Sequence, residues 1–80
     1  MKRSLETVEI GGLTCINREN AAKRINMSES LLDKVVRLTR AGKAKVPIKF
    51  IQYTKNAPIY FPVEGLDEFV QKVIKEGRAF

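Results

Sequence analysis

Three stretches of the chain repeat their apolar residues at the spacing of an α-helix. In residues 18–25 the apolar positions are Ala21, Ala22 and Ile25, and in residues 64–76 they recur at intervals of three and four. In residues 29–41 they fall within an arc of roughly 160° on a helical projection. That arc contains Leu31, Leu32, Val35, Val36 and Leu38. The periodicity predicts three helices whose apolar faces share one core.

Polar residues and glycines mark the ends of these helices. Asn17 and Ser28 can each accept a hydrogen bond from a free backbone amide, so we expect them to cap the first two helices. Asn26 tolerates the left-handed conformation of a tight turn. Gly42 and Gly77 suit the position that follows a last helical turn. The first two helices are therefore expected to meet at a short turn.

Between the second and third helices the pattern becomes that of strands. Residues 48–53 (IKFIQY) and 58–61 (PIYF) are rich in β-branched and aromatic residues, and residues 54–57 can form a turn between them. They predict a two-stranded hairpin with Lys55 at its tip. Pro58 has no amide hydrogen and places the second strand at an edge.

The order of these elements predicts a fold of the α+β class, a small winged helix-turn-helix. A helix-turn-helix is followed by a two-stranded β-hairpin wing and a C-terminal helix. We expect residues 13–80 to form this domain and residues 1–12 to form a flexible N-terminal arm. The short alternation at residues 7–10, followed by two glycines, is equally typical of an edge strand.

Length and composition favour a single globular domain without catalytic chemistry. The chain has 80 residues, of which 44% are hydrophobic and 30% are charged. It contains no histidine and one cysteine, Cys15, so the usual zinc ligand sets and an imidazole-activated thiolate cannot be assembled. We expect a buried Cys15, no enzyme activity, no cofactor and no small-molecule ligand. The apolar stretches are too short for a membrane span or a signal peptide, so we expect a cytoplasmic protein.

The positive charge is concentrated in one stretch. The formal net charge is +6, and residues 34–63 contain seven basic residues and no acidic one. A field of one sign on a small body attracts polyanions and is typical of nucleic-acid-binding proteins. A solvated, lysine-rich surface would give the same count. Because the charged stretch overlaps the helix-turn-helix pattern, we favour DNA binding.

The candidate DNA contacts follow from how a helix-turn-helix docks, with its second helix in the major groove. The planar fork of Arg37 suits guanine, and Asp33 could accept a hydrogen bond from a cytosine amine. Lysines on the loop and hairpin suit phosphate contacts. The predicted DNA-binding residues are Ser28, Ser30, Asp33, Lys34, Arg37, Arg40, Lys43, Lys45, Lys49 and Lys55.

Residues 13–31 (LTCINRENAAKRINMSESL) resemble the opening of the excisionase-like and AlpA-like winged-helix proteins, relatives of the MerR DNA-binding domain. Those proteins begin with a hydrophobic and a capping residue, a helix with paired alanines, and a hydrophobic-serine step into the recognition helix. Gly42, Val46-Pro47 and Ile59-Tyr60-Phe61 continue the similarity to about residue 74.

The resemblance implies a phage or mobile-element excisionase, a factor that directs recombination. Such a protein would bind repeated sites on double-stranded DNA cooperatively, self-associate there and bend the DNA. It would direct a phage integrase toward excision, and it could also repress transcription. By the same resemblance, Ser30, Lys34 and Arg37 would lie in the major groove.

Two alternatives involve other partners. A winged-helix scaffold could serve as a protein-interaction module, such as an antirepressor or an inhibitor of a host or phage protein, because an acidic partner would be attracted to the same field. RNA binding is less favoured. Phe50, Tyr53, Tyr60 and Phe61 are expected to pack within the hairpin instead of forming an exposed stacking platform.

Overall fold

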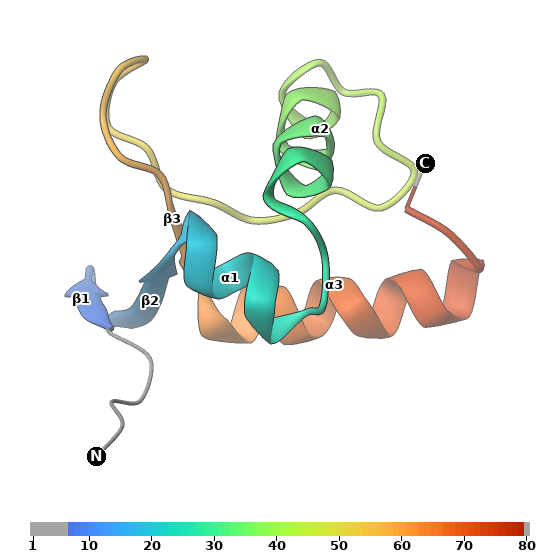
Figure 1. Cartoon of the computed structure of the whole chain (residues 1–80), viewed down its shortest axis with the longest axis horizontal. Helices are drawn as coiled ribbons and strands as arrows, with labels where there is room; N and C mark the ends of the chain where they lie inside the picture. Colours follow the sequence, from blue (N-terminus) through green and yellow to red (C-terminus); the bar gives the residue numbers. More distant parts are fainter. Residues whose placement is uncertain (1–6, 80) are drawn as a thin grey trace.

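The computed structural model describes residues 7–79 and shows a small α+β protein with three helices and a three-stranded antiparallel sheet (Figure 1). The order of elements is β1 (Val8–Ile10), β2 (Leu13–Asn17), α1 (Arg18–Arg24), α2 (Glu29–Arg40), β3 (Tyr60–Pro62) and α3 (Val63–Glu76). In the view of Figure 1, α2 stands above α1 and α3. The loop after α2 lies on one side of this helix, and residues 52–58 rise on the other.

The three predicted helices are confirmed to within one residue at each end. Their caps are also those that the sequence predicts. The Asn17 side chain accepts a hydrogen bond from the Asn20 amide at 2.8 Å, and Ser28 Oγ accepts one from the Leu31 amide at 3.1 Å. Gly77 ends α3 in the left-handed conformation, with φ at 92°. Local sequence signals therefore decide where each helix begins and ends.

A tight turn joins α1 to α2. Asn26 adopts φ of 55°, and its amide donates to the Lys23 carbonyl at 3.2 Å, while the Met27 amide donates to the Ala22 carbonyl at 2.8 Å. This pair of bonds is a Schellman motif, which satisfies carbonyls that the end of a helix leaves open. The turn fixes the direction in which α2 leaves α1.

The sheet corrects the prediction at the N-terminal arm and at both strands of the predicted hairpin. β1 pairs with β2 across the Gly11-Gly12 turn, and β2 pairs with β3. The edge-strand interpretation is thus confirmed for Val8–Ile10, and a flexible arm is wrong there; residues 1–6 lie outside the described residues. The predicted strand at 48–53 is also wrong, because only Ile51 pairs, in a single bridge to Tyr60. The second strand is Tyr60–Pro62 instead of 58–61.

The missing strand has a physical cause in the partners of its backbone donors. The Lys45 and Val46 amides both donate to the Ala79 carbonyl at 3.1 Å, and the Ile48 amide donates to Thr39 Oγ1 at 3.1 Å. The intervening residue is a proline without an amide hydrogen. These bonds hold residues 45–48 against α2 and Ala79, so the chain enters the predicted strand away from a ladder partner.

The helices and the sheet enclose one core. It comprises Ile16, Ala21, Ala22, Leu32, Val35, Val36, Val46, Ile48, Phe61, Leu66 and Phe69. Cys15 is buried, as predicted. The assignment of Leu31 to the core is wrong, because this side chain is 40% exposed. Leu31 lies at the margin of the apolar arc, where α2 turns toward solvent.

Candidate nucleic-acid interface

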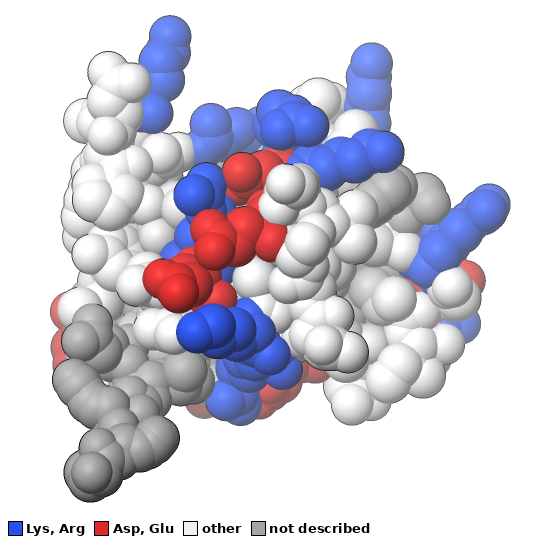
Figure 2. Space-filling view, in the orientation of Figure 1, with Lys and Arg blue, Asp and Glu red and all other residues white. Residues whose placement is uncertain are grey.

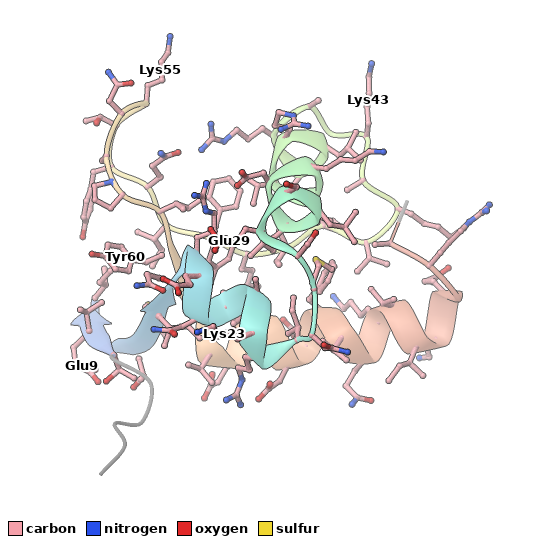
Figure 3. The ribbon with its side chains drawn as sticks, in the orientation of Figure 1. Glu9, Lys23, Glu29, Lys43, Lys55 and Tyr60 are labelled. Atoms are coloured by element: carbon pink, nitrogen blue, oxygen red, sulfur yellow. The ribbon has the colours of Figure 1, made fainter. Side chains whose placement is uncertain are left out.

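A basic face is formed by the exposed side of α2, the loop at residues 43–45 and the tip of the wing loop, which spans residues 52–57. Figure 3 shows Lys43 and Lys55 pointing the same way from loops on opposite sides of α2. In Figure 2, lysine and arginine side chains project along that edge of the molecule, and acidic side chains gather lower on the same view. Residues 34–63, which supply this face, contain no carboxylate side chain.

α2 contributes exposed polar residues along its outer side. Ser30, Lys34 and Arg37 are all exposed. Within residues 7–79, the Arg37 side chain forms no hydrogen bond or ion pair, so its guanidinium donors face solvent. Ser28, also predicted as a DNA contact, uses its oxygen to cap α2. Ser28 therefore has a structural role as the cap of α2, whereas Ser30 is exposed on its outer side.

Asp33 forms an ion pair with Arg18 of α1. Arg18 Nη1 lies 3.1 Å from both carboxylate oxygens of Asp33, and Arg18 Nε lies 3.3 Å from Glu29 Oε1. One arginine therefore pairs with both carboxylates on the first half of α2 and neutralises one of their two charges. It also ties α1 to the start of that helix, so Asp33 would have to exchange this partner to accept a bond from a base.

Arg40 contacts the wing instead of pointing into solvent alone. Its Nη2 donates to Gln52 Oε1, and its guanidinium carbon lies 5.1 Å from the centre of the Phe50 ring, a cation–π distance. Both partners are neutral, so the positive charge of Arg40 still contributes to the basic face.

Lys49 lies against α3, apart from the basic face. Its Nζ is 3.3 Å from Glu68 Oε1. Its stem crosses α3 at Gly65, where an added Cβ would come within 3.1 Å of the Lys49 Cβ. The glycine therefore allows this close approach, and the neighbouring carboxylate neutralises the lysine.

The remaining predicted cations are Lys43, Lys45 and Lys55. All three side chains are exposed, and none forms an ion pair in the part of the chain that the structure describes. The backbone of Lys45 is anchored by the Ala79 carbonyl. These lysines extend the positive field to both sides of α2.

The roles of two residues beside the basic face were not anticipated from the sequence. Tyr53 is 77% exposed, so its predicted packing within the hairpin is wrong, whereas Phe61 is buried and Phe50 and Tyr60 are half-buried. Gln52 bonds across the wing loop and to α2. The sequence marks neither role, because both depend on how the wing sits against α2.

Other kinds of site receive little support from the described residues. Burial, and then the negative charge of Glu9, raise the pKa of the Cys15 thiol, so this group is protonated at neutral pH. Residues 7–79 contain no group of three or more acidic, cysteine or histidine side chains placed to hold a metal ion. Within the same range, every helix is too short or too polar to cross a bilayer.

The arrangement suits a polyanion with charges spaced over more than one element. Cations on a helix, a following loop and a wing tip can contact several phosphates at once, and the exposed outer side of α2 can reach between them. No protein-family model, no curated protein and no solved structure matches this chain.

Proposed function

We propose that this protein is a small sequence-specific DNA-binding protein of the winged helix-turn-helix type. The observation that carries the proposal is the set of cations on the basic face that no carboxylate neutralises. Within residues 7–79 these include Arg37 on α2, Lys43 and Lys45 after it, and Lys55 on the wing. The three lysines lie beside α2, whose outer side has exposed hydrogen-bonding groups.

In this proposal α2 enters the major groove and α1 lies behind it, near the backbone. Arg37 offers a planar fork to guanine O6 and N7, and Ser30 and Lys34 lie on the same side of the helix. Lys43, Lys45 and Lys55 contact phosphates and fix the register of α2 without selecting a base. Arg18 supports this geometry by holding α1 against the start of α2.

A salt series tests DNA binding directly. Contact with four to six phosphates gives a plot of log K against log salt with a slope of about −4 to −5. The variant Arg37→Ala, Lys43→Ala should flatten the slope by about 2. The control Lys72→Ala, Lys75→Ala removes the same charge from exposed positions on α3 and should leave the slope unchanged. Fluorescence anisotropy of a labelled duplex measures all three proteins.

The absence of wild-type binding at low salt would reject the proposal. A protein partner captured by the wild type and lost in Arg37→Ala, Lys43→Ala would then favour a protein-interaction module, such as an antirepressor or inhibitor. Equal slopes for the two double variants would show that binding depends on net charge and not on the basic face.

The biological role that we propose is that of a phage or mobile-element excisionase. The similarity of residues 13–31 to excisionase-like proteins supports it, as does the small size of the domain. A single domain of this kind buries limited surface, so useful affinity would come from several copies on adjacent sites. Repression of a nearby promoter and contact with an integrase are parts of the same proposal.

Sedimentation on DNA with one site and with several sites tests the assembly. Cooperative binding predicts higher occupancy per site on the longer array at the same protein concentration. Equal occupancy per site would contradict cooperative assembly while leaving DNA binding intact.

A further inference from the structure

The wing loop has few backbone contacts of its own. Below it, Ile51 and Tyr60 exchange two hydrogen bonds, at 2.8 and 2.9 Å, and within it the Ala57 amide donates to the Thr54 carbonyl at 3.1 Å. The side chain of Gln52 forms the other hydrogen bonds across the loop. Its Nε2 donates to the Ala57 carbonyl at 2.7 Å and to the Lys55 carbonyl at 3.4 Å. One side-chain amide thus replaces part of a strand ladder.

The same amide is held by α2. Arg40, at the C-terminal end of that helix, donates from Nη2 to Gln52 Oε1 and lies over the Phe50 ring. The oxygen of Gln52 therefore faces the helix, and its nitrogen faces the two wing carbonyls. A continuous chain of contacts runs from α2 through Arg40 and Gln52 to the backbone of Lys55.

The wing loop lies apart from α1. An open groove of about 410 Å³, lined in part by Arg18, Glu29, Gln52 and Pro58, separates the wing from α1 and the start of α2. Tyr53 extends into solvent instead of packing on the helix. The connection through Arg40 is therefore a direct link between α2 and the wing tip.

We propose that Arg40 is a positioning residue that sets the place of Lys55 relative to α2, and not itself a DNA contact. The proposal rests on the proposed DNA-binding function. A wing fixed before binding loses less conformational freedom on the DNA, which strengthens the contacts it makes. Removing Arg40 should therefore weaken binding through Lys55.

The first experiment uses the unbound protein. The ¹⁵N heteronuclear NOE values of residues 53–57 report motion on the picosecond-to-nanosecond timescale. They should fall in Arg40→Ala and stay at the wild-type level in Arg37→Ala, which removes the same charge from the same helix. Arg40→Lys should give intermediate values, because lysine retains a donor but not the planar fork. Unchanged values in Arg40→Ala would overturn the proposal.

The second experiment is a double-mutant cycle on DNA affinity. Arg40→Ala should weaken binding roughly 2- to 10-fold, the range expected for one hydrogen bond. Most of that loss should disappear in a Lys55→Ala background, since Arg40 would act through Lys55. The matched cycle of Arg37 with Lys55 should be additive. Additive losses for Arg40 and Lys55 would make Arg40 an independent contact and overturn its positioning role.

The two experiments separate failure of this inference from failure of the proposed function. A wild-type protein that does not bind DNA would reject the function, and with it any role of Arg40 in binding. The NOE values would still decide whether Arg40 positions the wing.

Discussion

α1 and α2 both carry several cations, but the two helices differ in whether carboxylates neutralise these charges. All three basic side chains of α1 face carboxylates. Arg18 pairs with Glu29 and Asp33, and Arg24 pairs with Asp67 through two hydrogen bonds of 3.1 and 3.2 Å. The third, Lys23, lies 3.6 Å from a glutamate one turn earlier. The charge of α1 is neutralised within the fold.

On α2, by contrast, Arg40 binds neutral partners, and Arg37 forms no ion pair within residues 7–79. A hydrogen bond to an amide oxygen gives a guanidinium an acceptor and leaves its positive charge in place. A carboxylate accepts the same hydrogen bond and also neutralises the charge. The difference shows that a count of basic residues overstates the field over α1, whereas Arg37 and Arg40 on α2 keep their full charge. The charges of Arg37, Arg40 and Lys55 therefore remain available to a polyanion.

The largest expected effect concerns the two sides of α2 itself. Leu32 is fully buried, so Leu32→Ala should lower the free energy of unfolding by about 2–5 kcal/mol. Its neighbour Leu31 is 40% exposed, and Leu31→Ala should cost less than about 1 kcal/mol. Urea denaturation followed by circular dichroism measures both. Similar losses for the two variants would mean that the outer side of α2 also supports the fold.

A pair of arginine variants tests the contrast between the helices. Arg37→Ala should weaken DNA binding by about 1–3 kcal/mol if it contacts guanine through both arms. Arg24→Ala should change affinity by less than about 0.5 kcal/mol and unfolding by about 0–1 kcal/mol, as expected for an exposed ion pair. Each variant removes one positive charge, so anisotropy at one salt concentration compares them directly. Equal losses of affinity would contradict the distinction between the two helices.

Local signals explain which parts of this fold the sequence predicts. Asn17, Ser28 and Gly77 act within a few residues of themselves, and the helices they bound are confirmed. The pairing of β2 with β3 joins Ile16 to Phe61, residues far apart in sequence, and nothing near either one marks the partner. Residues 48–53 have a high strand propensity but do not form a strand. The amides of residues 45, 46 and 48 instead donate to groups in α2 and near the C-terminal end of the described chain.

The candidate site shows the same division. The position of the charged stretch can be predicted from sequence alone, and the structure places most of its cations on one face. The partners cannot be predicted in this way. Lys49 meets Glu68, and Arg40 meets Gln52, only because the wing and α3 pack where they do. Sequence therefore locates the charge, and tertiary structure decides which part of it is neutralised.

Substitution of either of two serines at the start of α2 should change the free energy of unfolding by a smaller amount, and the two should differ. Ser28→Ala removes the cap of α2 and should cost about 1 kcal/mol of unfolding free energy. Ser30→Ala lies two residues further along, makes no cap and should leave stability within about 0.5 kcal/mol. Thermal or urea unfolding compares them. A matching loss in Ser30→Ala would show that this residue also belongs to the fold and not only to the exposed side of α2.

The smallest effect is expected at Lys49, which tests whether a neutralised cation can still act on DNA. The pair with Glu68 is exposed, with side-chain exposures of 71% and 52%, so Lys49→Ala should change unfolding free energy by about 0–1 kcal/mol. Because Lys49 lies against α3, its loss should leave the salt slope of DNA binding unchanged, whereas Lys55→Ala should flatten it by about 0.9. Both variants lower the net charge by one. Equal flattening by Lys49→Ala and Lys55→Ala would mean that the DNA reaches the α3 side of the protein. An ion pair within the fold would then not prevent a lysine from contacting DNA.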